Sequence, residues 1–462
     1  MMALLFSENS KSAIATYVCS TETADEVLSG LPEHVQSWAK IQGFSGRYGQ
    51  NLVCPTPEGS VECALLGVGD AEARSRGRFH LAAAASGLPE GDYALANELP
   101  LDAQEYQILG WLLLGYRFDR YAKQSSKRVG LVAPAWVDHD RLETLAKAEA
   151  LCRDLVNTPT SDLGPQELED AVCAMAAELN ASVSVITGDA LLEQNFPMIH
   201  AVGRASSSQP RLIDMRYGDT GPKITLVGKG VCFDTGGLNL KPGGSMGLMK
   251  KDMGGSANTI ALASMIMALK LPVQLRLLIP AVENSVSGNA FRPGDILTSR
   301  SGQTVEINNT DAEGRLILAD ALSYASEEDP DLIVSMATLT GAARVALGPD
   351  LAPFYAGSDA VANALHTAGT EALDPLWRLP FHDPYEAMIE PGIADLDNAP
   401  SGGMAGSITA ALFLRRFVTN KEAYVHFDIY SWQPAPKPAR TKGGLMQGPR
   451  AILAALPKLL EM

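Results

Sequence analysis

The chain has 462 residues, which is long enough for two domains and for a substantial buried core. A composition that is 46% hydrophobic and 19% charged is that of a globular protein and excludes a disordered or fibrous chain. The formal net charge of -16 argues against binding of nucleic acid phosphates or of anionic lipid over most of the surface.

The first residues predict neither a signal peptide nor a membrane anchor. The start, MMALLFSENSKSA, lacks a basic segment and has only a short apolar run, and no later apolar stretch reaches membrane-spanning length. We therefore expect a cytoplasmic protein with no membrane partner. Six scattered cysteines without a CxxC pair indicate buried thiols rather than a disulfide scaffold or a zinc ribbon.

Residues 1–137 predict a small N-terminal α/β domain. The runs IATYVCS, NLVCPTP and CALLGVG are typical of strands, and QILGWLLLGYRF has the apolar spacing of a buried helix. Residues 138–157 keep apolar side chains at helical spacing up to the turn signal NTPTSDLGP. We interpret them as a helix that connects this domain to the next.

Residues 158–462 predict a larger α/β domain. Helical stretches such as PQELEDAVCAMAAEL alternate with the β-rich runs SVSVITG, KITLVGKG, QLRLLIPAV, LIVSMAT and YVHFDIYS. This alternation favours a central, mostly parallel sheet flanked by helices. Ligands of such sheets bind at the loops that follow the strands.

Two segments of this domain combine acidic and basic residues at loop positions. The first, KITLVGKGVCFDTGGLNLKPGGSMGLMKKDMGG, is a strand followed by glycine-rich loops that carry Lys229, Asp234, Lys241 and Asp252. The second, EINNTDAEGRLILADALSYA, places Asp311 and Glu313 directly before a helix. Any one of these acids is a weak signal, because acids often complement a helix dipole. Together they predict a site for a pair of divalent cations, which carboxylate oxygens bind well.

The motifs VGKGVCFDTGGLNLKP, MKKDMGG, NTDAEGRL and ATLTG resemble the signatures of the leucyl aminopeptidase (cytosol aminopeptidase) family. The resemblance covers roughly residues 155–462 and is strongest over 229–341. It implies a metal-dependent aminopeptidase that releases N-terminal amino acids from short peptides. It also implies a homohexamer and attack on the peptide carbonyl by a water that bridges two metal ions.

The resemblance also implies a role for each ligand. Asp234 and Glu313 would bridge the two metals, Asp252 and Lys229 would complete the tighter site, and Asp311 would belong to the more exchangeable one. Lys229 must be neutral to coordinate, because an ammonium has no lone pair. A salt bridge to one of the acids is the alternative role. Zinc or manganese, and also magnesium or cobalt, suit such ligands.

Two further cationic residues carry roles by the same resemblance. Lys241 would stay protonated and stabilise the oxyanion of the tetrahedral intermediate; the alternative is a solvated loop lysine. Arg315, in the first turn of a helix, would hold an anion, which in the family is bicarbonate acting as general base.

Four residues match positions that line the family's pocket for the N-terminal side chain, although ordinary packing explains them equally well: Met249, Thr338, Leu339 and Gly341. The segment HFDIYSW departs from the family, because Tyr430 and Ser431 stand where a small Ala-Gly pair is usual. A phenol there would narrow or reshape the pocket, so the side-chain preference stays open.

Other functions have weaker support. GGSMG, residues 243–247, matches the GxSxG pattern of serine hydrolases but lacks the preceding apolar strand and the following helix. The seven histidines form no HExxH. Some family members bind DNA, which the acidic balance opposes here. A member without activity is opposed by the chemically correct residue at every expected catalytic position.

Overall fold

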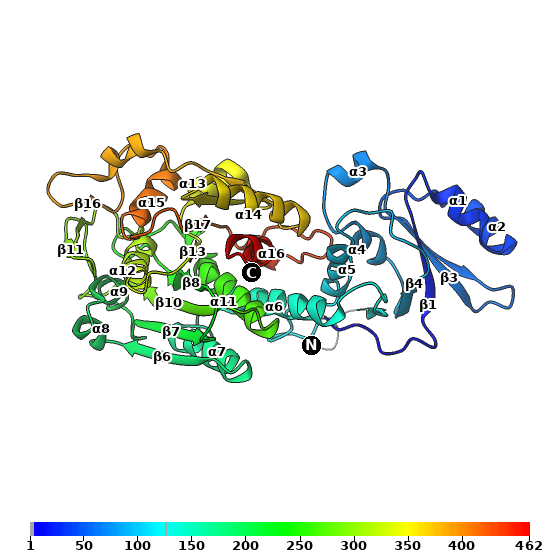
Figure 1. Ribbon diagram of the computed structural model, residues 1–462, viewed down its shortest axis with the longest axis horizontal. Coiled ribbons are helices and arrows are strands. Elements are labelled where there is room, and N and C mark those ends of the chain that lie inside the picture. Colours follow the sequence, from blue (N-terminus) through cyan, green and yellow to red (C-terminus); the bar gives the residue numbers. More distant parts are fainter. Residues whose placement is uncertain (1–3, 125–126) are drawn as a thin grey trace. The chain divides into compact units, whose positions relative to one another are not determined.

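The computed structural model describes residues 4–124 and 127–462, which form two compact units (Figure 1). The first unit comprises the described residues up to Ala150 together with Ala435–Lys442. The second comprises Leu151–Pro434 and Gly443–Met462. The sequence predicts one uninterrupted domain over 158–462; in the structure the proline-rich segment Ala435–Lys442 belongs to the first unit instead.

The first unit is a small α/β domain, as expected, built on a sheet of order β2-β3-β1-β4-β5. Parallel pairs join β1 to β3, β1 to β4 and β4 to β5, while β2 runs antiparallel to β3. Its elements are β1 (Ile14–Cys19), α1 (Ala24–Ser29), α2 (Glu33–Ile41), β2 (Asn51–Pro55), β3 (Val61–Gly67), α3 (Ala71–Ser75), α4 (His80–Ala85), β4 (Gly91–Leu95), α5 (Gln104–Leu113) and β5 (Val129–Leu131). The helix α6 (His139–Asn157) follows, and the boundary between the units falls within it.

The second unit contains the remaining elements. Up to its middle these are α7 (Pro165–Glu178), β6 (Ser182–Thr187), α8 (Ala190–Glu193), α9 (Pro197–Gly203), β7 (Arg211–Tyr217), β8 (Lys223–Gly228), β9 (Gly230–Asp234), α10 (Gly243–Met246), the 3-10 helix η2 (Met249–Met253), α11 (Gly254–Ala268), β10 (Gln274–Asn284), β11 (Ile296–Thr298) and β12 (Thr304–Glu306). Then follow α12 (Gly314–Ser326), β13 (Leu332–Ala337), α13 (Gly341–Leu347), β14 (Ala352–Ala356), α14 (Asp359–Glu371), β15 (Leu376–Arg378), η3 (Asp383–Ile389), β16 (Leu396–Asp397), α15 (Gly406–Arg415), β17 (Tyr424–Asp428), β18 (Trp432–Gln433), β19 (Gly443–Gly444) and α16 (Pro449–Leu459).

A mixed sheet forms the centre of this unit, in the order β15-β14-β17-β13-β8-β10-β7-β6, with β9 beside β10. The central strands β17, β13, β8 and β10 are parallel, and the antiparallel pairs lie toward the two sides. Every residue of β13 is buried, as expected for a strand that is covered on both faces. The prediction of a mostly parallel sheet flanked by helices is confirmed.

Helices cover both faces of the sheet. Side chains alternate along β8: Val227 joins the core cluster that contains α12, while Gly228 faces α11. A Cβ atom on Gly228 would lie 2.3 Å from Thr259 Oγ1, so only glycine allows α11 to pack this closely. Since the parallel strands end at one edge of the sheet, the loops after β9, β13 and β17 come together there.

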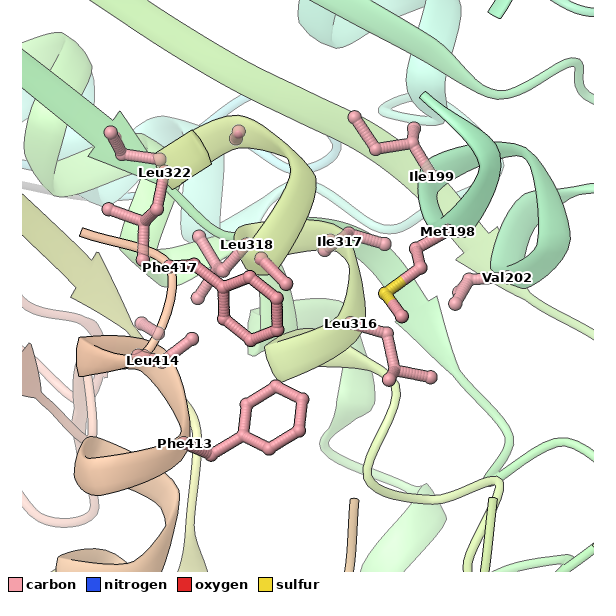
Figure 2. Packing of buried hydrophobic residues seen from close by; sticks show 14 of the residues in the cluster. Met198, Ile199, Val202, Leu316, Ile317, Leu318, Leu322, Phe413, Leu414 and Phe417 are labelled. Atoms are coloured by element: carbon pink, nitrogen blue, oxygen red, sulfur yellow. The ribbon is translucent and has the colours of Figure 1, made fainter. Parts of the chain in front are cut away.

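The helix α12, which begins within the NTDAEGRL motif, is held in place by a large hydrophobic core (Figure 2). Asp320 on this helix is fully buried and accepts hydrogen bonds from the backbone N–H groups of Met198 (2.8 Å), Ile199 (3.3 Å) and Arg300 (2.8 Å). The apolar side chains that pack together here come from α9, α12, the end of α15 and the turn that follows it: Met198, Ile199, Val202, Leu316, Ile317, Leu318, Leu322, Phe413, Leu414 and Phe417. This packing holds the acids at the start of α12 in place.

Candidate active site

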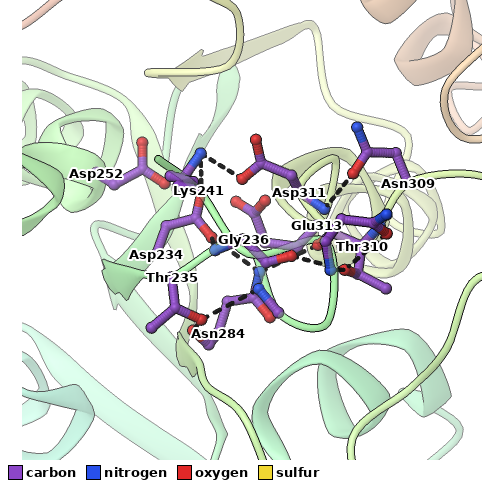
Figure 3. A network of polar contacts seen from close by, with 12 residues as sticks. Asp234, Thr235, Gly236, Lys241, Asp252, Asn284, Asn309, Thr310, Asp311 and Glu313 are labelled. Carbon is purple, nitrogen blue, oxygen red and sulfur yellow. Dashed lines mark hydrogen bonds and ion pairs between the residues drawn. The ribbon is translucent and has the colours of Figure 1, made fainter. Parts of the chain in front are cut away.

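Three buried carboxylates converge at the strand-end edge of the sheet (Figure 3). Asp234 ends β9, Asp252 lies in η2, and Glu313 immediately precedes α12. One oxygen atom of each lies within 4.8 Å of the others, and each residue is at most 3% exposed. Three converging carboxylates are strongly unfavourable without positive charge between them.

Lys229, the residue between β8 and β9, supplies part of this charge. Its Nζ lies 2.8 Å from Asp252 Oδ2 and 2.9 Å from Glu313 Oε1, and it donates to the carbonyl oxygen of Thr338. Burial disfavours the ammonium, but the charges of the surrounding carboxylates outweigh it and raise the pKa of Lys229 above its ordinary value. Lys229 therefore forms salt bridges in this structure, which is the alternative role that the sequence analysis gives for it.

Lys241 lies between one of these carboxylates and a fourth one. Its Nζ is 2.8 Å from Asp234 Oδ2 and also forms an ion pair with Asp311. Burial acts against its charge, yet the neighbouring carboxylates raise the pKa of Lys241 above the usual lysine value. Asp311 is more exposed than the other three acids and lies outside their tight group.

The acids carry pKa shifts that reflect their crowding. Burial, reinforced by Asp234, raises the pKa of Glu313 to about 8. The same two causes raise the pKa of Asp311 to about 6. Burial also acts against the charge of Asp252, but Lys229 and Lys251 outweigh it and lower the pKa of Asp252. When lysine ammoniums rather than metal ions balance the acids, some of these carboxyl groups are thus protonated near neutral pH.

Residues other than the predicted metal ligands hold two of the acids in place. Asn284 Nδ2 donates to Asp234 Oδ1 at 2.8 Å, and the N–H of Gly236 donates to the same oxygen at 2.9 Å. Thr338 Oγ1 donates to Asp252 Oδ1 at 2.8 Å. Asn284 is the register partner of Asp234 across β10 and β9, a relation that no local motif reveals.

This donor set fits divalent metal ions. Asp252 Oδ2 and Glu313 Oε1 are buried, lie beside an ammonium and accept no well-directed hydrogen bond. Buried carboxylate oxygens of this kind need a cation, and hard cations prefer them as ligands. The ammonium of Lys229 occupies the position of such a cation, and as a free amine it would offer a nitrogen ligand.

A cavity of about 640 Å³ opens over the cluster. All predicted site residues except Glu313 line it, including the four pocket candidates Met249, Thr338, Leu339 and Gly341. Glu313 lies buried directly behind this surface, next to Lys229. Motifs that are more than 100 positions apart in sequence therefore meet in one cavity.

Arg315 is a buried guanidinium in the first turn of α12 that lines the same cavity. Its Nε and Nη1 atoms have no hydrogen-bond partner among the described residues. Burial lowers the pKa of Arg315 to about 10, and Asp428, Glu313 and Asp397 partly oppose this shift. Unpaired guanidinium donors at a helix N-terminus suit a bound anion.

The two residues that depart from the family pattern have different positions. Tyr430 lines the cavity, where the phenol reduces the space available to a substrate. Ser431 is fully buried with a φ of 53°, a left-handed conformation, and its Oγ atom donates to the Leu445 carbonyl oxygen and accepts from Asn258. Of these two residues, only Tyr430 therefore lines the cavity.

Asp428, another residue without a sequence signal, anchors the loop after β13. It accepts hydrogen bonds from the N–H groups of Leu339 (3.0 Å) and Thr340 (2.9 Å), and from the hydroxyls of Thr340 and Ser407. Burial raises the pKa of Asp428, and these donors oppose the shift. The carboxylate thus fixes one wall of the cavity.

The serine of the GGSMG segment lacks the setting of a nucleophile. Ser245 lies in the short helix α10, which follows a loop rather than a strand. Among the described residues that line the cavity, none is a histidine that could act as its base. The structure therefore gives the serine-hydrolase reading no support.

No described helix combines the length and the apolarity needed to cross a membrane.

Comparisons with known proteins found similar sequences and structures. The model of the cytosol aminopeptidase family, catalytic domain, matches residues 150–453, and that of the M17 aminopeptidase N-terminal domain matches 17–134. A probable cytosol aminopeptidase from Syntrophotalea carbinolica is 37% identical, over 94% of this chain and 92% of the relative. The crystal structure of a cytosol aminopeptidase from Coxiella burnetii is 43% identical with a TM-score of 0.93, covering 99% of both chains. A bottromycin maturation enzyme, BotP, in complex with Mn is 31% identical with a TM-score of 0.86, over 96% of this chain and 99% of that one.

Proposed function

Because this chain belongs to the cytosol aminopeptidase family, we propose that it removes N-terminal amino acids from short peptides with the help of two divalent metal ions. The residues proposed to hold the metals are Lys229, Asp234, Asp252, Asp311 and Glu313. One observation carries this proposal: three buried carboxylates from separate segments converge, and among the described residues lysine ammoniums form the ion pairs with them.

When bound, the metal pair would supply Lewis acidity toward the peptide carbonyl and a water of lowered pKa as nucleophile. Lys241 then has a separate task. It lies at the cavity wall, where its ammonium pairs with Asp234 and Asp311; with these carboxylates bound to metal, the ammonium would be free to contact a substrate. A protonated lysine there stabilises the negative charge that develops on the carbonyl oxygen.

Arg315 is proposed to bind the anion that accepts the proton from the nucleophilic water. Arg315 lines the cavity that contains the acid cluster and carries buried, unpaired donors, so an anion held there would lie close to the reacting groups. Bicarbonate is the anion that the family resemblance implies. A weak base at this position fits general-base catalysis near neutral pH.

The metal identity is proposed more broadly, as zinc or manganese, with magnesium or cobalt as alternatives. Oxygen ligands with a single amine suit all four ions, so cellular supply has a large influence on which is bound. The similar structure that is described in complex with Mn supports a divalent ion in this fold.

Hydrolysis of aminoacyl-anilides by metal-depleted protein, with each divalent ion added back singly, tests the proposal. We expect no activity without metal, restored activity with at least one ion, and loss of activity and of bound metal in Glu313→Gln. Glu327→Gln, at the far end of α12 in an ion pair with Arg300, is the matched control and should behave as the unsubstituted protein. Full activity and metal content in Glu313→Gln would refute the assignment.

The family resemblance also leads us to propose a homohexamer in the cytoplasm. Light scattering of the purified protein should then give six times the subunit mass of 49.0 kDa. A monomer at micromolar concentration would contradict this proposal without affecting the chemistry of the site.

A further inference from the structure

One lysine of the cavity has no ion pair among the described residues, although its charge acts on the neighbouring Asp252. Lys251 lies in η2 next to Asp252, lines the cavity and is only 6% exposed. Lys229 and Lys241 each contact two carboxylates, whereas the Lys251 ammonium forms neither an ion pair nor a hydrogen bond with any described residue. A buried, unpaired ammonium is energetically costly and requires an explanation.

The surroundings of Lys251 are aromatic and cationic. Its Nζ lies 5.2 Å from the centroid of the Tyr430 ring, and the guanidinium carbon of Arg344 lies 5.1 Å from the same centroid. Arg344 is exposed on α13, also lines the cavity and has no ion pair among the described residues. Two cations thus gather at one aromatic ring, which offers each only a modest attraction.

This group lies among the residues that are proposed to hold the N-terminal side chain of a substrate. Met249 belongs to the same 3-10 helix as Lys251, and Gly341 starts the helix that carries Arg344. All of them line one cavity. A leucine side chain would bind weakly in a pocket with cations and an aromatic wall, because it cannot form an ion pair with the Lys251 ammonium.

We propose that Lys251 and Arg344 select substrates whose N-terminal residue is acidic, glutamate or aspartate. This inference rests on the proposed aminopeptidase function and names its substrate class. The substrate carboxylate completes the ion pairing of the Lys251 ammonium and is shared with the Arg344 guanidinium at the rim. Charge-assisted hydrogen bonds in a partly buried site discriminate strongly against a neutral analogue.

The 4-nitroanilides of glutamate, glutamine and leucine test this inference on the full-length, metal-loaded protein. Glutamate and glutamine match in shape and differ in charge, and an anilide has no C-terminal carboxylate. We expect kcat/KM to be higher for the glutamate than for the glutamine substrate by about tenfold or more, the worth of a charge-assisted contact. Lys251→Gln should remove most of this ratio, and Arg344→Gln part of it.

The variants are chosen so that a folding defect does not imitate the result. Arg344 is exposed, so its substitution leaves the core intact. Lys250→Gln is the matched control: its ammonium bonds the Asn157 carbonyl oxygen and does not line the cavity, so the ratio should stay unchanged.

Three results would overturn the inference. One is cleavage of the leucine anilide without preference for glutamate over glutamine. Another is a glutamate preference that survives in both variants. The third is a Lys251→Gln effect seen only with the free C-terminus of a dipeptide, which would assign the cation to that carboxylate. If no anilide is cleaved with any metal, the proposed aminopeptidase function itself fails.

Discussion

Metal binding at the carboxylate cluster should release protons, and the structure indicates how many. The metal-free site keeps Lys229 protonated, because the neighbouring carboxylates, above all Asp252, raise its pKa above the ordinary value. An ammonium cannot be a ligand, so coordination by Lys229 requires the loss of one proton. Glu313, whose pKa burial raises to about 8, is largely protonated at pH 7 and must lose a second.

The pH dependence of the metal affinity follows from the number of protons that metal binding releases. At pH 7 the metal-free protein holds about two more protons at the site than the metal-bound protein does. Since the metal-free form binds more protons, raising the pH favours the metal-bound form. Each released proton changes the apparent affinity about tenfold per pH unit, so affinity should rise about 100-fold between pH 6 and pH 7.

Calorimetric titration of chelator-stripped protein with manganese, in two buffers with different heats of ionisation, measures the proton count directly. Lys229→Met should lower this count by about one. Lys241→Met is the control: it also lies between two carboxylates, but it is not a proposed ligand, so its removal should not lower the count. Equal heats in both buffers, or an unchanged count in Lys229→Met, would refute the reasoning.

Other perturbations have equally defined results. Gly314→Ala would place a Cβ atom 2.5 Å from Lys229 Cε, so the amount of bound metal, measured by atomic absorption, should fall. Gly341→Ala is the control: its Cβ meets nothing closer than 4.0 Å, so this variant should keep its metal. Asp320→Ala leaves three backbone N–H groups without an acceptor and should lower the free energy of unfolding in urea by about 3 kcal/mol or more; a change below 1 kcal/mol would contradict this account. Chelated protein should remain folded by circular dichroism, because Lys229 and Lys241 still balance the acids; loss of helix signal would show that the metals hold the fold.

Local chemistry made much of this protein predictable from its sequence. The runs that predict strands, such as LIVSMAT, form strands, because apolar β-branched residues in short runs suit a sheet that is covered on both faces. Glu313 and Asp311 stand directly before a helix as expected. Motifs of a few residues carry the family resemblance of the catalytic domain. The match of an N-terminal family model to residues 17–134 was not predicted, since that region has only ordinary strand and helix patterns.

Other features arise only when distant segments meet. Asn284 holds Asp234 because the two face each other across neighbouring strands, and Asp428 holds the loop after β13 from the end of β17. A lone asparagine or aspartate at a strand end has no periodicity or spacing that distinguishes it from a solvated one. The assignment of Ala435–Lys442 to the first unit likewise depends on contacts rather than on composition.

The sequence by itself determined which ligating atoms this protein carries, because the type and local spacing of side chains are written in the chain. The tertiary structure alone decided their charge and accessibility. In the motif MKKDMGG, Lys250 caps a helix end while its neighbour Lys251 is buried beside Tyr430, without an ion pair among the described residues. Burial and Coulomb interactions depend on neighbours that folding brings from elsewhere in the chain, so two adjacent lysines acquire different chemistry.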